Sequence, residues 1–352
     1  MEGRTVKAIG LLSGGLDSTL AHALIKAQGI AVKAVTFYTG FCLVETQRRM
    51  GRVRKDGTAP RNAALHAAAR LETEIELVDI SGREYLDMIA RPKHGYGANA
   101  NPCIDCRIFM FRKAREIMEQ DGADFVFTGE VLGQRPKSQR RDPMRVIEKQ
   151  SGLEGRILRP LSAQLLDPTL AEKQGLVDRS RLLAISGRSR KPQMELARQL
   201  GVTDYPQPAG GCCFLTDEAF ARKFHDLMDH RPDRRLEAEE VQLLATGRHF
   251  RLSPAVKLVV GRNEGENQQL GQYADARRAL RLEAAALMGT VGLVEGEPSE
   301  EERSLASRII ARYGKGKDLP RVTVEWRLGG ELKHAVEVGP FRDEAEFERF
   351  RI

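Results

Sequence analysis

Two groups of residues in this sequence combine types and spacings that could do chemistry. The first is Ser13-Gly14-Gly15-Leu16-Asp17-Ser18, which follows an apolar run and precedes a helical pattern. The glycines let backbone N–H groups approach an anion, the serines add hydroxyl groups, and the N-terminus of the following helix favours negative charge. The segment therefore predicts a phosphate site. The plain alternative is a glycine turn in which Ser18 caps the helix.

The second group consists of cysteines. Cys103 and Cys106 have the C-x-x-C spacing at an expected helix start, where the helix dipole favours the thiolate form. Cys212 and Cys213 follow two glycines far downstream. Because adjacent side chains diverge, we expect one of these two to be functional and the other to be its neighbour. Cys42 stands alone, and we expect a structural role for it.

The elements that position these residues alternate between strands and helices in the first half of the chain. Apolar runs predict strands at 6–12, 30–37, 74–80 and 123–128, and helical periodicity predicts helices at 18–28, 60–71 and 103–120. This order is typical of α/β proteins, in which a mostly parallel sheet carries helices on both faces. Such sheets bind ligands at the carboxyl ends of their strands.

The second half has a different pattern. Strands are expected at 256–260, 279–283, 322–328 and 335–338, and a helix at 300–313. The sequence therefore predicts a parallel α/β domain at 1–217 and a smaller α+β domain at 218–352. No apolar run reaches the roughly 18 residues of a transmembrane helix, and no signal-peptide pattern precedes the first strand. We therefore expect a cytoplasmic protein without membrane contact.

The phosphate segment lacks the G-K-[ST] of a Walker A loop and the G-x-G-x-x-G of a dinucleotide site. It resembles the S-G-G-x-D-S loop of the PP-loop ATP pyrophosphatases, which bind the pyrophosphate part of ATP and cleave ATP between the α and β phosphates. The sequence also contains N-P-C-x-x-C at 101–106 and G-G-C at 210–212. With all three motifs, the chain is similar to the tRNA-thiolating (thiouridylase) branch of that family. The resemblance implies a HUP-type fold, ATP and Mg²⁺ as cofactors, Asp17 beside Mg²⁺, and tRNA as the partner.

The resemblance also assigns roles to residues outside the two groups. Phe37, at the end of the second expected strand, would flank the adenine, although the position also suits a core aromatic residue. Gly129, at the end of a later strand, would leave space for the nucleotide. Polar groups near the nucleotide or the target base would come from Gln134, Ser138 and Gln139. An ordinary solvated loop is the alternative for this last segment.

Basic residues indicate an anionic partner, since the formal net charge is +7. The turn at 186–191, Ser-Gly-Arg-Ser-Arg-Lys, could hold phosphate from ATP or RNA, or simply begin a helix. The run at 48–55 could contact a tRNA backbone or be solvated surface. Residues 256–267 are similar to NFACT-R, an RNA-binding domain that occurs fused to PP-loop enzymes of this type. The resemblance implies an RNA-binding second domain.

Two sulfur chemistries fit the cysteines. In one, Cys103, Cys106 and Cys212 (or Cys213) hold a 4Fe–4S cluster with one iron open to sulfide. In the other, one cysteine carries a persulfide and a second resolves it through a disulfide. A structural zinc is a third alternative, and it would need a fourth ligand. The C-x-x-C spacing with one remote cysteine favours the cluster.

The sequence thus predicts an ATP-dependent tRNA sulfurtransferase. A uridine carbonyl oxygen attacks the α phosphate, pyrophosphate leaves, and sulfur from sulfide or a carrier protein displaces AMP. The catalytic residues would be Asp17, Cys103, Cys106, Cys212 and Cys213, and no histidine has an acid–base context. The competing hypotheses are an amide-forming PP-loop ligase and an RNA-binding protein with a relic nucleotide fold. The modified uridine and the oligomeric state stay open.

Overall fold

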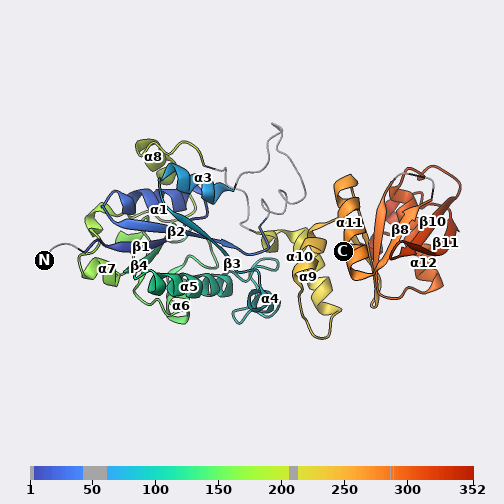
Figure 1. The fold of residues 1–352 in the computed structure, drawn as a ribbon, viewed down its shortest axis with the longest axis horizontal. Coiled ribbons are helices and arrows are strands. Elements are labelled where there is room, and N and C mark those ends of the chain that lie inside the picture. Colours follow the sequence, from blue (N-terminus) through green and yellow to red (C-terminus); the bar gives the residue numbers. More distant parts are fainter. Residues whose placement is uncertain (1–3, 43–61, 206–212, 286, 288) are drawn as a thin grey trace. The chain divides into compact units, whose positions relative to one another are not determined.

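The computed structural model describes residues 4–42, 62–205, 213–285, 287 and 289–352. The chain divides into two compact units, and the second unit begins at Asp217. The first unit contains a parallel sheet and the second an antiparallel sheet, each with its own helices (Figure 1). The predicted fold class, a parallel α/β structure followed by an α+β structure, is therefore confirmed.

The first unit is built on a five-stranded sheet with the order β3-β2-β1-β4-β5. All of its ladders are parallel, so the carboxyl ends of the strands meet at one edge. The strands are β1 (Lys7–Leu11), β2 (Ala31–Tyr38), β3 (Ile75–Asp79), β4 (Phe125–Thr128) and β5 (Ile157–Leu158). The prediction missed β5, because two residues are too few for a recognisable pattern.

Helices cover both faces of this sheet. They are α1 (Leu16–Lys26), α3 (Ala63–Arg70), α4 (Arg83–Ala90), α5 (Cys103–Gln120), α6 (Arg141–Ser151), α7 (Leu170–Lys173) and α8 (Lys191–Gln199). On one face, Ala8 packs with Ala21 of α1. On the other face, Val126 packs with Phe111 of α5 and Ile147 of α6. Figure 1 shows α1 and α3 on one side of the strands and α5 and α6 on the other.

The second unit contains a six-stranded antiparallel sheet with the order β11-β10-β8-β9-β7-β6. Its strands are β6 (Arg248–Ser253), β7 (Val256–Val260), β8 (Leu280–Ala284), β9 (Val291–Glu295), β10 (Val322–Leu328) and β11 (Glu331–Val338). Its helices are α9 (Glu218–Asp229), α10 (Ala238–Ala245), α11 (Glu264–Arg277) and α12 (Glu300–Tyr313). Trp326 is fully buried and its indole N–H donates to Ser307 of α12 at 3.0 Å, which fixes this helix on the sheet.

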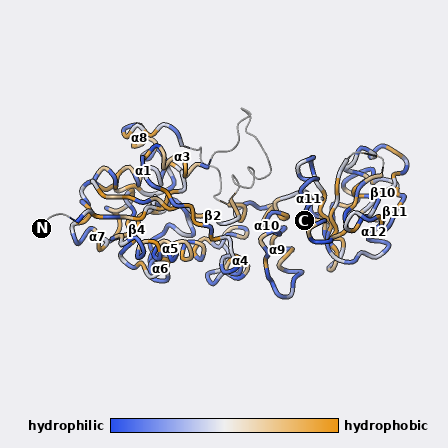
Figure 2. The backbone as a smooth tube through the Cα atoms, viewed as in Figure 1, coloured by the Kyte–Doolittle hydropathy of each residue, from blue (hydrophilic) through white to orange (hydrophobic). Residues whose placement is uncertain are grey.

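Apolar residues are concentrated in the strands of the first unit, as the colouring along β2 and β4 in Figure 2 shows. All four residues of β4 are buried, which is typical of a central strand covered on both faces. Within the described parts of the chain, no helix has the length and apolar character needed to cross a membrane.

Candidate active site

The predicted phosphate segment forms the turn between β1 and α1. Helix α1 begins at Leu16, so Gly15 occupies the N-cap position, and among the described residues no side chain caps this helix. The Ser18 hydroxyl instead donates to the carbonyl of Gly15 at 2.9 Å and lies 3.1 Å from the Ser13 hydroxyl. The alternative in which Ser18 caps the helix is therefore wrong. A helix N-terminus without a side-chain cap is suited to an anion.

Asp17 lies in the first turn of α1, at the carboxyl edge of the sheet. Its Oδ2 accepts a hydrogen bond from Gln134 Nε2 at 3.0 Å, across 117 residues of sequence. Its Oδ1 is buried and has no hydrogen-bond partner within the described residues. A buried carboxylate oxygen without a donor is costly, and an oxygen of this kind is a preferred ligand of Mg²⁺. The site therefore fits a nucleotide with its magnesium ion.

Two of the expected glycines serve protein packing. Gly14 has a φ of +75°, and a Cβ there would lie 2.1 Å from the backbone carbon of Ala63, at the start of α3. A Cβ on Gly129 would lie 2.4 Å from the backbone nitrogen of Ser18. The space that the sequence assigned to the nucleotide beside Gly129 is thus occupied by the first turn of α1. Gly15 differs, because a Cβ there would meet only the Ser13 hydroxyl, at 3.5 Å.

The segment after β4 is partly buried. Ser138 is fully buried and Gln139 is 3% exposed, so the solvated-loop alternative is wrong for these two residues. The Ser138 hydroxyl and one oxygen of Gln139 have no hydrogen-bond partner among the described residues. Such buried polar atoms are suited to a ligand or ordered water. Contact of Ser138 and Gln139 with the nucleotide stays a prediction.

The basic turn at 186–191 lies against the same segment. Gly187 N donates to Leu132 O at 2.7 Å, two residues before Gln134. Helix α8 follows the turn and has no side-chain cap in the described structure, and Gln193 in its first turn is fully buried with both amide atoms unpaired. The sequence analysis missed Gln193. The sequence gives one indication of its burial: Gln193 lies four residues before Ala197, on the same buried face of α8.

The two cysteines of the C-x-x-C spacing lie in the first turn of α5, half-buried. The Tyr85 hydroxyl of α4 lies 3.2 Å from the Cys106 sulfur. The carboxylate of Asp105 accepts hydrogen bonds from the backbone N–H groups of Lys93 (3.1 Å) and His94 (2.9 Å). The loop before α5 is therefore fixed to the cysteine-bearing turn.

Hydrogen bonds join residues 214–216, which follow Cys213, to the residues that precede Cys103. Ala100 N donates to Leu215 O at 3.2 Å, and the Asn99 amide donates to Thr216 O at 2.8 Å. Phe214 N donates to Phe41 O at 3.0 Å, next to Cys42. Three cysteine-bearing segments thus converge.

Two predicted features lie outside the described residues: Cys212 and the basic run at 48–55. Among the residues that are described, no group of three His, Cys, Asp or Glu side chains is arranged to hold a metal ion.

Lys137 was not singled out from the sequence, although it belongs to the same segment as Gln134. Its ammonium donates to Gly95 O at 2.9 Å, in the loop that Asp105 fixes to α5. Burial lowers the pKa of Lys137, and the charges of Cys103 and Asp105 oppose this shift. Gln134, which donates to Asp17, and Lys137, which donates to the loop that Asp105 fixes to α5, are three residues apart. This short segment therefore connects the phosphate loop with the cysteine turn.

Glu130, directly after Gly129, was also missed. It is 2% exposed and forms ion pairs with Arg107 of α5 at 3.0 Å and with Arg159 at 3.1 Å. Arg159 also pairs with Glu148 of α6. This buried chain of charges holds the ends of β4 and β5 against α5 and α6, and each charge in it is compensated.

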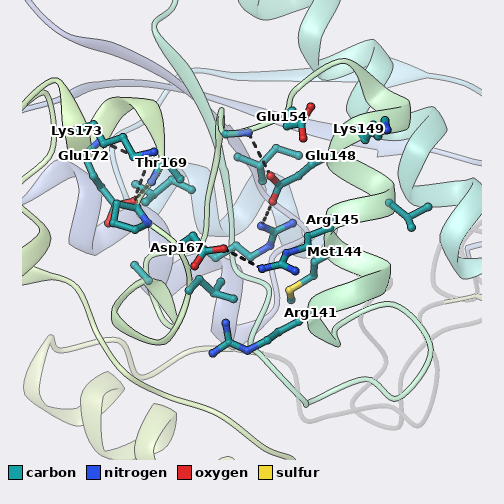
Figure 3. Close-up of a pocket in the computed structure, with 18 residues that line it drawn as sticks. Arg141, Met144, Arg145, Glu148, Lys149, Glu154, Asp167, Thr169, Glu172 and Lys173 are labelled. Carbon is teal, nitrogen blue, oxygen red and sulfur yellow. Dashed lines mark hydrogen bonds and ion pairs between the residues drawn. The ribbon is translucent and has the colours of Figure 1, made fainter.

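A pocket of about 400 Å³ lies beside β5 (Figure 3). Arg141, Arg145 and Lys149 of α6 line it, and Arg145 pairs with Asp167 at 3.1 Å. None of the residues predicted for the site lines this pocket. We therefore place no part of the candidate active site there.

Two further side chains bear on the predicted chemistry. Phe37 is half-buried and packs against the core under α5, as the core-aromatic alternative expects, and its contact with adenine stays a prediction. His22 is fully buried, with Nδ1 2.7 Å from Ser18 O, and burial lowers its pKa to about 4. His22 is therefore neutral at pH 7, which makes it a packing residue behind the loop.

The first unit is an α/β structure in which an uncapped helix N-terminus follows the first parallel strand and a partly buried carboxylate lies in the first turn of that helix, an arrangement that is suited to an anionic ligand. Comparison with known proteins shows which families the two units resemble. Residues 3–166 match the family described as "Thiamine biosynthesis protein (ThiI)". Residues 247–351 match "NFACT protein RNA binding domain". The predicted resemblances to a PP-loop family of tRNA thiolation and to NFACT-R are therefore confirmed.

Two curated relatives carry names from tRNA thiolation. A "Probable tRNA sulfurtransferase" of Thermococcus kodakarensis is 26% identical over 190 residues, which cover 54% of this chain and 44% of the relative. A "tRNA-specific 2-thiouridylase MnmA" of Petrotoga mobilis is 33% identical over 135 residues, covering 36% of this chain and 35% of the relative. The chain thus spans less than half the length of either relative.

A solved structure entitled "Crystal structure of a 4-thiouridine synthetase - RNA complex with bound ATP" is 22% identical. The match covers 56% of this chain and 52% of that one, with a TM-score of 0.33. A score this low does not define a common fold.

Proposed function

We propose that this protein is an ATP-dependent tRNA uridine sulfurtransferase. The observation that carries the proposal is the segment Gln134–Lys137, which connects Asp17 of the phosphate loop with the cysteine turn of α5. An enzyme that first adenylates a carbonyl oxygen and then replaces it by sulfur needs these two sites side by side. An amide-forming ligase would need no thiols there.

The adenylation step uses the phosphate loop. A uridine carbonyl oxygen attacks the α phosphate of ATP, the bond between the α and β phosphates breaks, and pyrophosphate leaves with the bonding electrons. The uncapped N-terminus of α1 and the hydroxyl groups of Ser13 and Ser18 support binding of the pyrophosphate part. The unpaired Oδ1 of Asp17 supports its role beside Mg²⁺. Gly15 lines this site, whereas Gly14 and Gly129 shape it through packing.

The sulfur step uses the cysteines. Cys103, Cys106 and Cys212 would hold a 4Fe–4S cluster, which supplies an iron that binds sulfide. Two half-buried thiols one helical turn apart, with a third cysteine-bearing segment hydrogen-bonded beside them, support this ligand set. The persulfide route, in which Cys213 or Cys212 would act with a cysteine of α5, is the second candidate because the same segments converge.

The second unit supports binding of tRNA. We propose that residues 218–352 form an RNA-binding domain, since most of this range matches the NFACT RNA-binding family. The sulfur donor would be sulfide or a sulfur-carrier protein, and the cytoplasm would be the site of action. Phe37, Ser138, Gln139 and the turn at 186–191 would complete the nucleotide and base site.

The test is an assay of the two half-reactions with purified full-length protein. With ATP, Mg²⁺ and tRNA, we expect pyrophosphate release, and with sulfide added we expect thiouridine and AMP in equal amounts. Pyrophosphate release that depends on an amine instead of tRNA would support an amide-forming ligase. Binding of tRNA without any pyrophosphate release would support an RNA-binding protein with a relic nucleotide fold.

A further inference from the structure

A basic, glycine-containing turn follows helix α12 in the second unit. Its sequence is Gly-Lys-Gly-Lys at 314–317, and both lysines, Lys315 and Lys317, are exposed. Within the described residues, neither ammonium group has a hydrogen-bond or ion-pair partner, and the adjacent carboxylate of Asp318 pairs with neither. Arg312, in the last turn of α12, adds a third cation. The turn therefore presents positive charge that no ion pair compensates.

The protein around this turn fixes its conformation. A Cβ on Gly316 would lie 2.7 Å from Val322 Cγ2 and 2.9 Å from Leu287 Cδ1, so only glycine fits here without displacing a neighbour. Gly314 N donates to a carbonyl of α12 at 3.0 Å, and Leu319 N donates to Gly316 O at 3.0 Å. The turn is thus preformed, and a ligand that binds to it has little ordering to do.

Two backbone donors of the turn are left free. The N–H groups of Lys315 and Gly316 donate to no acceptor in the described parts of the chain, although Gly316 is a buried residue. Backbone N–H groups at buried residues are rarely left without a partner. Consecutive free N–H groups form a concave site for an anion, and lysine is a common partner of phosphate. The turn is therefore suited to the oxygens of a phosphate group.

Helix α12 also separates charges of opposite sign. Its first turn contains Glu300, Glu301 and Glu302, whereas Arg312 and the basic turn lie at its other end. The helix has 14 residues and is therefore about 21 Å long. The helix dipole favours acidic residues in the first turn and a cation in the last one, but Lys315 and Lys317 lie beyond the end of the helix. This distribution orients a polyanion toward the turn at 314–317.

We propose that the turn at 314–317 binds the phosphate backbone of tRNA. The inference rests on the proposed function, because it names the contact that the RNA-binding domain at 218–352 makes. The turn lies inside the range 247–351 that matches the NFACT RNA-binding family. Its free groups are all donors and cations, so they bind phosphate oxygens and read no base. Each phosphate that a lysine neutralises releases counterions, which makes the contact sensitive to salt.

The test measures tRNA binding by the full-length protein as a function of salt. Lys315→Gln/Lys317→Gln removes both ammonium groups and keeps the side chains polar. Fluorescence anisotropy of labelled tRNA, between roughly 50 and 200 mM KCl, gives the slope of log K against log salt concentration. We expect the slope to become shallower by about one to two, and the affinity at the lowest salt to fall roughly ten- to 100-fold, because two phosphate contacts are lost.

The matched control is Arg303→Gln/Lys333→Gln, which removes the same number of positive charges from the second unit. Arg303 follows the acidic first turn of α12. Lys333 pairs with Glu331 at 2.6 Å and lies just after the turn that joins β10 to β11, at the end of β10 opposite to 314–317. We expect this control to keep the wild-type slope, and Lys315→Arg/Lys317→Arg to keep most of it.

An unchanged slope in Lys315→Gln/Lys317→Gln would overturn the inference, as would an equal change in the matched control, since only net charge would then matter. Fluorescence of Trp326, in β10, confirms that the second unit of each variant is folded. Both negative results would leave the proposed function standing, because pyrophosphate release at saturating tRNA is measured separately and should equal that of the wild type. Absence of that release from the wild-type protein, with a shallower slope in the lysine variant, would count against the proposed function and leave the phosphate contact in place.

Discussion

The phosphate loop and the cysteine turn are both placed at starts of helices, but the chain builds them differently. The loop Ser13–Ser18 is continuous in sequence, and the groups that we propose bind phosphate come from one turn and the first residues of α1. The cysteine turn depends on segments more than 100 residues apart, which are joined by hydrogen bonds from the backbone N–H of Ala100 and the side-chain amide of Asn99. A site built from consecutive residues can be recognised from the sequence, whereas a site built from distant segments can be recognised only from the fold.

The comparison predicts that a substitution in one site impairs one half-reaction and leaves the other intact. The largest loss is expected for pyrophosphate release when the loop is altered. Asp17→Asn removes the charge that we propose lies beside Mg²⁺ and keeps the size of the side chain. We expect pyrophosphate release to fall about 10²- to 10³-fold, because a preorganised charge at a phosphoryl group contributes on this scale. The measurement is initial pyrophosphate release with tRNA present. Asp178→Asn, at the exposed N-cap of a 3₁₀ turn, is the control. Comparable losses in both variants would contradict a specific role of Asp17.

The cysteine turn should fail in the opposite way. Cys103→Ser should lower thiouridine formation by at least about 100-fold, since a hydroxyl replaces the thiol at sulfur transfer. Pyrophosphate release should stay at the wild-type level. Cys42→Ser is the control, because the sequence predicts a structural role for Cys42. If Cys103→Ser also lost pyrophosphate release, the two sites would not be separable.

Iron analysis distinguishes a cluster from a persulfide at the cysteine site. In anaerobically reconstituted protein, Cys103→Ser, Cys106→Ser and one of Cys212→Ser or Cys213→Ser should lose iron and visible absorbance together. The other vicinal variant should keep both. Wild-type protein that binds no iron and still thiolates tRNA would decide in favour of the persulfide route.

Substitution of the two glycines of the loop should have different effects on stability. Gly14→Ala places a Cβ against the backbone of Ala63 at positive φ, and we expect a loss of about 2–4 kcal/mol in the free energy of unfolding. Gly15→Ala meets only open space and the Ser13 hydroxyl, so its cost should stay within about 1 kcal/mol. Urea unfolding measures both. Equal stability of the two variants would show that α3 does not constrain Gly14.

His22 predicts a pH dependence of the stability of the first unit. Its pKa is about 4 in the folded protein against 6.5 when exposed, so the unfolded chain binds more protons between these values. Stability should therefore fall as the pH drops from 6.5 to 4, by up to about 3 kcal/mol, and stay unaffected by this group above 6.5. Circular dichroism melts of wild type and His22→Gln measure the difference. Trp326 fluorescence reports the second unit separately, because it is the only tryptophan. An identical pH slope in both proteins would contradict the assignment.

Sequence patterns predicted the parts of the fold that repeat locally. The strands at 6–12, 30–37, 74–80 and 123–128 correspond to β1 to β4. β4 is buried along its whole length, which gives a continuous apolar run, whereas no residue of β3 is buried. The start of α1 was expected two residues late, since Ser18 was considered as the cap and Gly15 occupies that position. In the second unit, β6 and β9 were missed. β6 is mixed polar and apolar, Arg248-His-Phe-Arg-Leu-Ser, so no alternation stands out.

Residues whose roles depend on distant contacts could not be predicted. Three ordinary polar residues could not be singled out from the sequence. The fold places Lys137 beside the loop that precedes α5, Glu130 between two arginines, and Gln193 in the buried first turn of α8. The packing partners of Gly14 and Gly129 were also invisible, because Ala63 and Ser18 approach them from other elements. Asp17 and the C-x-x-C pair could be singled out because a short motif carries their chemistry.

The central claim is that adenylation at the loop and sulfur transfer at the cysteine turn act on one tRNA uridine. The most direct measurement supplies anaerobically prepared full-length protein with tRNA, ATP and radiolabelled sulfide, and quantifies labelled nucleoside, AMP and pyrophosphate together. We predict one labelled thiouridine for each AMP and each pyrophosphate, with no label incorporated without ATP. Pyrophosphate and AMP formed without any thiouridine, in protein that retains its cysteines and receives sulfide, would contradict the account.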